Sequence, residues 1–189
     1  MKPHNEMDFK LILAGVGGQG ILFASSVFSE TALAQGYDVI GSETHGMSQR
    51  GGSVIAHLKI GPYESPLIRT GTADLLLAFD QDEAYRALAF VKPGGLCFIN
   101  SLSGDFWDPR VKAYLERNNI AAHSLAADSI AMELGSPRSA NLALIGHAAS
   151  VPEVPFSHDE IKATIERLSP SKWREVNLRA FEAGYGRER

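Results

Sequence analysis

The sequence has one cysteine, Cys97, among its 189 residues. One thiol cannot form a disulfide within the chain, and it cannot supply the several thiolates that an iron–sulfur cluster or a cysteine zinc site requires. If the protein takes part in redox chemistry, the electron carrier must therefore lie elsewhere. Because Cys97 falls in the apolar run LCFI at residues 96–99, we expect it to be a buried and unreactive strand residue.

An excess of positive charge and a long apolar segment are also missing. The 18 Lys and Arg are outnumbered by 22 Asp and Glu, which gives a formal net charge of −4. Nucleic-acid-binding proteins are usually basic, so we expect no nucleic-acid partner. The N-terminal residues are polar, with no visible signal peptide, and the first apolar run, at 11–14, is far shorter than the roughly 20 residues of a membrane helix. We therefore expect a cytoplasmic protein with no membrane partner.

Motifs of self-sufficient catalysis are absent as well. There is no G-x-S-x-G elbow, no Walker-type lysine follows the glycines, and no two histidines have the spacing of a helical metal site, so we expect no metal site. His57 lies in a predicted strand and is expected to be packed or solvated. Asp80, Asp82 and Glu83 suit the start of a helix rather than a catalytic pair. Asn141 is expected to cap a buried helix rather than reach a site.

The spacing of apolar residues predicts strands that alternate with helices. Strands are expected at residues 9–14, 37–41, 53–60, 73–79, 96–100 and 120–123. Helices are expected at residues 20–35, 80–90, 109–118, 128–134, 141–150 and 171–183, with another after the capping box at 157–160. This alternation predicts one α/β domain over residues 1–189, with a three-layer α/β/α arrangement and a largely parallel sheet. Residues 151–189 are expected to form a surface linker, 151–156, and C-terminal helices.

A Rossmann-like glycine loop, GVGGQG, follows the first predicted strand. Gly15, Gly17 and Gly20 have the spacing G-x-G-x-x-G, which lets backbone N–H groups approach a phosphate at a helix N-terminus. Glu43 lies 23 positions after Gly20, close to where a dinucleotide-binding domain places its ribose-binding carboxylate. A nicotinamide- or flavin-binding site and a glycine turn needed only for close strand–helix packing both remain open at this point.

A second polar loop, SETHGMSQRGGS at residues 42–53, follows the second predicted strand. Arg50 offers a forked donor for a carboxylate or phosphate, and the amides of Gly51 and Gly52 can join it. His45 titrates near neutrality and can move a proton or donate to an oxyanion. Because α/β proteins bind ligands at the carboxyl ends of strands, we expect a functional site here; a surface loop whose glycines only turn the chain is the alternative.

Together, GVGGQG and ETHGMSQRGGSV resemble the gamma subunit or domain of the 2-oxoacid:ferredoxin oxidoreductases. Within that family, the form HGMSQRGGSV is most similar to the small (beta) subunit of indolepyruvate oxidoreductase. ADLLLAFDQDEAYRAL at 73–88 and NLALIGHA at 141–148 fit the family in the same order. The resemblance therefore covers most of the chain, although the last forty residues match less closely.

This resemblance implies a small subunit of a thiamine-diphosphate-dependent enzyme. The enzyme would oxidatively decarboxylate indolepyruvate, or another aryl-pyruvate, to its acyl-CoA and pass electrons to ferredoxin. Thiamine diphosphate and iron–sulfur clusters would belong to the large (alpha) subunit, with coenzyme A as co-substrate, so this chain alone would be inactive. An exposed apolar patch is expected where the large subunit docks, and the isolated chain could pair with itself as a homodimer.

The resemblance also implies roles for residues of the two loops. His45 would assist proton movement or polarise the keto oxygen, and Arg50 would pair with a carboxylate or phosphate. The expected cofactor-binding residues are Gly15, Gly17, Gly18, Gln19, Gly20, Gln49, Gly51, Gly52 and Ser53. Two alternatives remain: an autonomous NAD(P)- or FAD-binding Rossmann oxidoreductase built on the glycine loop, and a non-catalytic assembly subunit.

Overall fold

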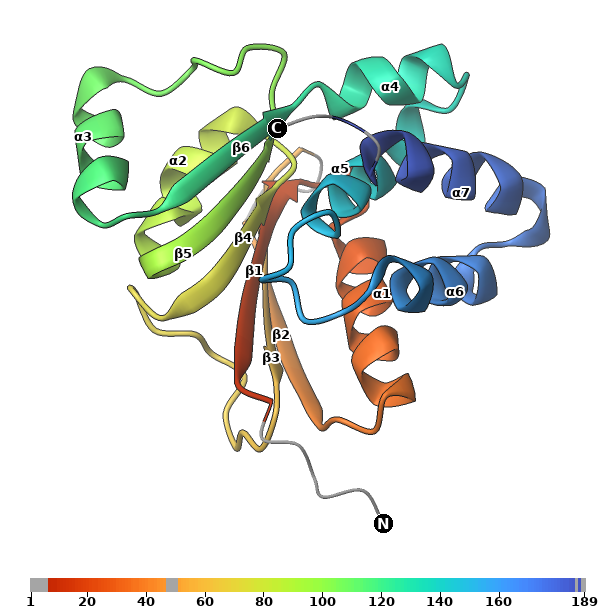
Figure 1. The fold of residues 1–189 in the computed structure, drawn as a ribbon, viewed down its shortest axis with the longest axis horizontal. Helices are drawn as coiled ribbons and strands as arrows, with labels where there is room; N and C mark the ends of the chain where they lie inside the picture. Colours follow the sequence, from red (N-terminus) through yellow and green to blue (C-terminus); the bar gives the residue numbers. More distant parts are fainter. Residues whose placement is uncertain (1–6, 47–50, 186, 188–189) are drawn as a thin grey trace.

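The computed structural model describes residues 7–46, 51–185 and 187 and shows a twisted sheet with helices on both faces (Figure 1). The strands are β1 (Phe9–Val16), β2 (Val39–His45), β3 (Ser53–Ile60), β4 (Ala73–Ala78), β5 (Val91–Asn100) and β6 (Ala121–Leu125). The α-helices are α1 (Ile21–Ala34), α2 (Gln81–Ala87), α3 (Pro109–Arg117), α4 (Ala127–Glu133), α5 (Ala140–Ala148), α6 (His158–Leu168) and α7 (Ser171–Tyr185). Short 3-10 turns, η1 (Leu88–Phe90) and η2 (Pro137–Ser139), precede β5 and α5. The predicted three-layer α/β fold is confirmed.

The six strands are ordered β2-β3-β1-β4-β5-β6. β1, β4, β5 and β6 are parallel neighbours, whereas β3 runs antiparallel to both β1 and β2. The sheet is therefore largely parallel, as predicted, and β2 points the same way as β1 although β3 separates them. As a result, the carboxyl ends of β1, β2, β4 and β5 all lie at one edge of the sheet, called the carboxyl edge below.

Strand β2 extends further than the sequence predicts. It was expected to end at Gly41, but residues 39–45 pair in continuous register with 60–54 of β3. The segment is polar because β2 lies at the border of the sheet, where side chains on one face need no apolar cover, and the backbone ladder alone holds it in place. The predicted second loop is thus a β-hairpin whose connection, called the hairpin loop below, spans only 46–52.

Each face of the sheet has its own apolar cluster, because successive side chains of a strand point to opposite sides. Leu11 and Leu13 of β1 face α1 and α5, whereas Ile12 and Ala14 face α2 and α3. Helices α6 and α7 lie outside α1 and α5, farther from the sheet (Figure 1). This second cover explains why residues 141–148 of α5 are all buried, as its apolar sequence predicts.

The segment 151–156 is a surface linker only in part: Pro152 and Glu153 are exposed, as predicted, whereas the apolar side chains turn inward. Val151, Val154 and Phe156 are buried and belong to the same apolar cluster as α1 and α5. Their side chains pack inward because α6 must return along α1, so the connection follows the core. Within the described ranges, no helix has both the length and the apolar character needed to cross a membrane.

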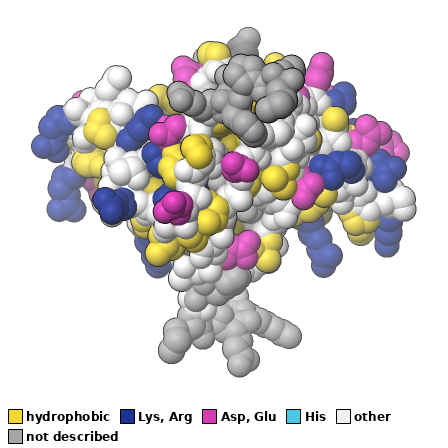
Figure 2. Space-filling model, turned by 90° about the horizontal axis from the view of Figure 1, so that it is seen from below, with side chains coloured by type: hydrophobic (Ala, Val, Ile, Leu, Met, Phe, Trp, Pro, Cys, Tyr) yellow, Lys and Arg dark blue, Asp and Glu magenta, His cyan; other side chains and the backbone are white. Residues whose placement is uncertain are grey.

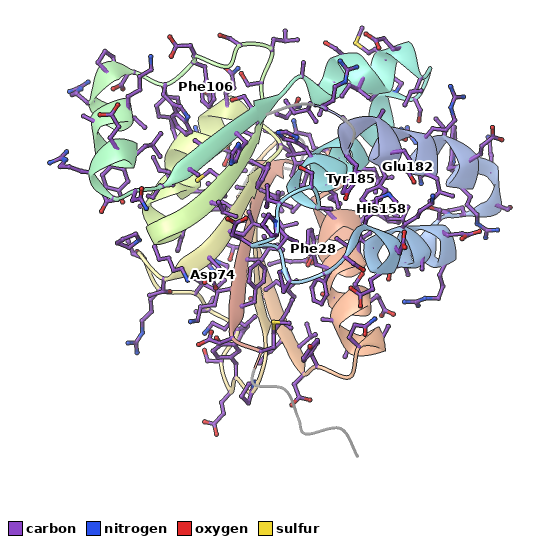
Figure 3. The ribbon with its side chains drawn as sticks, in the orientation of Figure 1. Phe28, Asp74, Phe106, His158, Glu182 and Tyr185 are labelled. Carbon is purple, nitrogen blue, oxygen red and sulfur yellow. The ribbon has the colours of Figure 1, made fainter. Side chains whose placement is uncertain are left out.

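His158, the first residue of α6, connects that helix to α7. Its ring nitrogens lie 2.9 Å from a carboxylate oxygen of Asp159 and 3.0 Å from one of Glu182, and the ring stacks on Phe181 (Figure 3). Partial burial lowers the pKa of the imidazole, but the hydrogen bonds to Asp159 and Glu182 and their charges outweigh it, so the pKa is raised. The ion pairs therefore favour the protonated ring and hold α6 against α7.

On the face shown in Figure 2, Lys and Arg side chains lie mainly at the two sides, toward α3 and toward α6 and α7. Acidic side chains lie in the middle and also among the basic ones at the right side. That face offers no continuous basic surface for a nucleic-acid backbone.

Helices α5 and α7 touch through their backbones at two glycines. A Cβ on Gly146 would overlap the carbonyl oxygen of Phe181, and a Cβ on Gly184 would overlap that of Ala143. Both overlaps involve backbone atoms, which cannot rotate away as a flexible side chain can. The close crossing of α5 and α7 therefore depends on these two positions having no side chain.

We expect Gly146→Ala to lower the free energy of unfolding by about 1–3 kcal/mol or more, because one methyl group must push two packed helices apart. Gly104→Ala is the matched control, since a Cβ there meets no atom within 4 Å, and we expect a change within about 0.5 kcal/mol. Chemical denaturation monitored by circular dichroism measures both. Equal unfolding free energies for the two variants would contradict the close crossing.

Candidate functional site

The glycine loop and the hairpin loop, far apart in the sequence, meet at the carboxyl edge. The register of β1 and β3 places Val16, the last residue of β1, opposite Ser53, the first residue of β3. The chains leaving these two positions are therefore adjacent, and the N–H of Gly17 donates to the carbonyl of Gly52 at 2.9 Å. The structure thus brings together eight of the predicted cofactor-binding residues: Gly15, Gly17, Gly18, Gln19, Gly20, Gly51, Gly52 and Ser53.

The side chain of Gln19 holds the glycine loop in its folded shape. Its Oε1 accepts from the N–H of Val16 at 2.7 Å, and its Nε2 donates to the carbonyl of Phe79 at the end of β4 at 3.1 Å. The backbone N–H of Gln19 also donates to the carbonyl of Val16. Among the described residues, the N–H groups of Gly18 and Gly20 have no acceptor, so they are the loop amides free to meet a ligand.

Asn141 supports the glycine loop from α5. It is the second residue of that helix, only 4% exposed, and its Nδ2 donates to the carbonyl of Gly20 at 3.1 Å. Ser139, not Asn141, occupies the N-cap position, but Oδ1 of Asn141 accepts from the N–H of Leu142 at 2.9 Å in the first turn, so Asn141 serves both the start of α5 and the glycine loop. Gly20 has φ of 77°, and a Cβ there would lie 2.5 Å from Nδ2 of Asn141, so this position needs glycine for two reasons.

Glu83 braces the start of β3 and is the site residue that sequence reasoning missed. Its side chain is buried, Oε2 accepts from the hydroxyl of Ser53 at 2.5 Å, and Oε1 pairs with Arg86. Asp80 caps α2 as expected, accepting from two backbone N–H groups. Glu83, however, shares the buried stripe of Ala84 and Ala87. This shared stripe was the signal in the sequence that the carboxylate faces inward and needs hydrogen-bond partners.

Of the two predicted catalytic residues, His45 and Arg50, the structure describes only the backbone of His45. His45 is the last residue of β2, opposite Val54 in the ladder, but its side chain lies outside the described residues. Gln49 and Arg50 also lie outside the described residues. The structure therefore fixes the backbone position of His45 and the two ends of the hairpin loop, at 46 and 51–52. The roles predicted for His45, Gln49 and Arg50 remain proposals.

Glu43 does not lie where a dinucleotide-binding domain needs it. In such a domain the second strand lies beside the first, so its terminal carboxylate is near the glycine loop. Here β3 separates β2 from β1, and the exposed Glu43 lines a serine-rich hollow against α1 instead. The dinucleotide-binding alternative therefore loses its ribose-binding carboxylate.

The remaining nucleophilic and titratable candidates are structural. Burial lowers the pKa of the His57 imidazole, as does nearby Lys59, and the neutral ring accepts at Nδ1 from the N–H of Ile68. Burial raises the pKa of the Cys97 thiol, which is fully buried in β5 and so unreactive, as predicted. No group of three metal-ligating side chains occurs among the described residues. With its lone buried thiol, the chain does not fit an iron–sulfur cluster.

Together, these features define the class of site that the chain presents. The site consists of backbone amides and braced polar loops at the carboxyl edge of an α/β sheet. Within the described ranges it contains no nucleophile paired with a base, as an independent hydrolase or transferase would. Such an edge can bind and orient a ligand through its backbone amides.

The sequence profile of the pyruvate ferredoxin/flavodoxin oxidoreductase family matches residues 10–187. The chain belongs to this family, and the resemblance seen in the two loops is confirmed. The match also covers the C-terminal helices, which the loop motifs alone could not place.

Individual relatives agree with the family assignment. The chain is 36% identical to indolepyruvate oxidoreductase subunit IorB of Thermococcus kodakarensis, covering 94% of each chain. It is 34% identical to subunit IorB of Methanothermobacter thermautotrophicus, covering 95% of this chain and 97% of the relative. The gamma subunit of a keto/oxoacid ferredoxin oxidoreductase from Geobacter sulfurreducens has the same fold, with a TM-score of 0.74 at 23% identity over 94% of this chain and 96% of the other.

We expect Glu83→Gln to lower the free energy of unfolding by about 1–3 kcal/mol, because a buried charge-assisted hydrogen bond and an ion pair are lost together. Glu116→Gln, at an exposed position on α3, is the control and should change stability by less than about 0.5 kcal/mol. Urea denaturation of both variants measures the difference. If the two glutamate variants unfold at the same urea concentration, Glu83 does not brace the site.

Proposed function

We propose that this chain is the small subunit of a cytoplasmic indolepyruvate (aryl-pyruvate) ferredoxin oxidoreductase. The complex would oxidatively decarboxylate the 2-oxoacid to its acyl-CoA and pass the electrons to ferredoxin. The observation that carries the proposal is the Gly17–Gly52 hydrogen bond, which joins the two polar loops into one surface at the carboxyl edge. The full-length match to two IorB subunits favours the aryl-pyruvate branch.

The large subunit is the proposed partner, and it would hold thiamine diphosphate and the iron–sulfur clusters. The single, buried Cys97 supports this division, because this chain has no thiolates to hold a cluster. Leu102, 80% exposed, follows β5 directly at the carboxyl edge. An apolar side chain so exposed beside the polar loops suits a docking contact at the same edge.

Each loop has a role in the proposed complex. The free N–H groups of Gly18 and Gly20 would bind an anionic group of the substrate or of coenzyme A at the start of α1. Arg50 would pair with a carboxylate or phosphate, and His45 would hold or deliver a proton near the keto oxygen. Thiamine diphosphate, when bound to the large subunit, supplies the cleavage of the carbon–carbon bond. Gln19, Asn141 and Glu83 would keep these groups in place.

The proposal is tested by anaerobic reduction of a viologen dye with indolepyruvate, coenzyme A and thiamine diphosphate. The assay compares this chain, a related large subunit, and the two combined. We expect activity only in the mixture. Failure of the chains to associate, or no activity with any aryl-pyruvate in an assembled complex, would contradict the proposal.

In the active complex, we expect Arg50→Ala to lower kcat/KM by an amount equivalent to about 2–4 kcal/mol, the cost of truncating one partner of a buried charged contact. Arg69→Ala is the control, because Arg69 is exposed and lies beyond β3, near the start of β4. If Arg50→Ala and His45→Ala change only the stability of the complex, with turnover per assembled complex unaltered, the chain is the non-catalytic assembly subunit instead.

A further inference from the structure

Strand β2 lies at the border of the sheet, and its outer side is open. β3 pairs with it on one side, and no strand of the described residues pairs with it on the other. Natural proteins usually protect such a border with a lysine, a proline, a bulge or a very short strand. Residues 39–45 contain no lysine or proline, and they pair with β3 in continuous register. A further strand can therefore pair with β2.

The backbone of β2 presents hydrogen-bonding groups to this open side. In an antiparallel ladder, alternate residues direct both their N–H and their C=O groups at the neighbouring strand. Just beyond one end of β2, the N–H of Gly46 donates to the carbonyl of Ser53. Just beyond the other end, the carbonyl of Asp38 accepts from the N–H of Gly61. The even-numbered residues of β2 therefore bond to β3, and the odd-numbered ones direct their N–H and C=O groups outward. These are Val39, Gly41, Glu43 and His45.

Helix α1 adds an apolar surface at the same border. Leu22 and Leu33 are 46% and 52% exposed, and they lie about three turns apart, so both are on one side of the helix. Ser26 and Ser29 fall between them on that side and line a hollow of about 430 Å³ together with β2. This stripe of α1, called the border stripe below, thus has a leucine at each end and small hydroxyl side chains in the middle.

The border stripe and β2 are complementary to a second copy of themselves. A two-fold interface requires the same surface on both partners, so each feature must match its own copy in the opposite direction. When two border stripes run antiparallel, Leu22 of one copy lies toward Leu33 of the other, and the serines meet in the middle. Gly41 of β2 lines the hollow beside the middle of the stripe. A two-fold axis through Gly41 therefore relates both the two β2 strands and the two α1 helices.

A register centred on Gly41 also keeps like charges apart. It places Glu43, the only charged residue of 39–44, opposite Val39 of the second copy. The two Glu43 residues are then about 13 Å apart along the strand direction, at about 3.3 Å per residue. A register centred on Glu43 itself would place two carboxylates directly opposite each other, which is destabilising. At the axis Gly41 has no side chain that could keep the two strands or the two helices apart.

We propose that a second copy of this chain pairs its β2 with β2, antiparallel and centred on Gly41. The two sheets become one continuous sheet, and the two border stripes pack across the join. Because the paired strands run in opposite directions, the carboxyl edges of the two copies point away from each other and stay accessible. The inference stands apart from the proposed function, since it concerns the chain without a large subunit.

Analytical ultracentrifugation of the full chain tests the pairing of the strands. We expect a dimer, and Glu43→Pro should raise its Kd by about tenfold or more, because each copy loses one outward N–H while the bonds to β3 remain. Glu43→Ala is the matched control: it removes the same side chain but keeps the N–H, so the dimer should persist. Circular dichroism reports that both variants are folded. A wild-type chain that is monomeric at sub-millimolar concentration, or equal Kd values for the two variants, would overturn the proposal.

The border stripe is tested by the double variant Leu22→Lys and Leu33→Lys, in which two ammonium groups replace the apolar ends. We expect this variant to be largely monomeric in the same experiment. Leu67→Lys is the control, because Leu67 is equally exposed, at 57%, but lies in the segment between β3 and β4. If the double variant dimerises as well as Leu67→Lys does, the two α1 helices do not pack across the join.

The position of the axis is tested by cysteine cross-linking. In the Gly41 register, Ile40 of one copy lies opposite Ser42 of the other in a non-hydrogen-bonded pair, with Cα atoms about 4.5 Å apart, which is within reach of a disulfide. Chains with Ile40→Cys and chains with Ser42→Cys should therefore cross-link when they are oxidised together, and neither should cross-link alone. The native Cys97 is fully buried and does not compete. Cross-linking of either variant with itself, or none in the mixture, would contradict the Gly41 axis.

Discussion

The antiparallel insertion of β3 between β1 and β2 determines where the site lies. Because Val16 and Ser53 are opposite each other in the ladder, the glycine loop and the hairpin loop leave the sheet side by side and share the Gly17–Gly52 hydrogen bond. In a dinucleotide-binding domain β2 would occupy the place that β3 takes here, and its terminal carboxylate would serve the glycine loop. Because β3 takes this place and runs in the opposite direction, a polar hairpin lies beside the glycine loop where such a domain has its ribose-binding carboxylate.

Three side chains from three different elements then hold the loops at this edge. Gln19 bonds within the glycine loop and to the end of β4, Asn141 reaches Gly20 from α5, and Glu83 anchors Ser53 from α2. Each is wholly or largely buried with its polar atoms partnered, which is the condition under which a buried polar group stabilises rather than costs free energy. The amides of Gly18 and Gly20 are left for a ligand because their neighbours are already bonded. A site built in this way can hold a ligand in a fixed orientation.

Much of the fold could be predicted from the sequence, because it depends on local apolar patterns. The run at 73–79 predicts a buried strand, and the nearly unbroken apolar sequence of 141–148 predicts a helix covered on all sides; both are confirmed. The length of β2 could not be predicted, since its polar residues are held by the ladder with β3 and not by an apolar core. The burial of Val151, Val154 and Phe156 likewise depends on how α6 returns along α1.

Local composition was enough to predict which loops form the site. It was not enough to predict the tertiary contacts that hold these loops together. Glycines and polar residues marked the two loops, but their contact follows from the direction of β3, which no local pattern encodes. Asn141 bonds to a residue 121 positions away in the chain, and Glu83 to one 30 positions away. Their spacing within their own helices predicts a cap and a helix-start charge, and only the packed structure reveals the second partner.

The central claim is that the carboxyl edge is the working edge of this chain, and hydrogen–deuterium exchange tests it most directly. The exchange would be measured on the free chain and on the chain assembled with the large subunit. The account predicts slower exchange on assembly at 15–20, 51–53 and 79–83, with the opposite edge, 61–71, unchanged. Protection confined to 61–71, with the glycine loop exchanging as in the free chain, would contradict it.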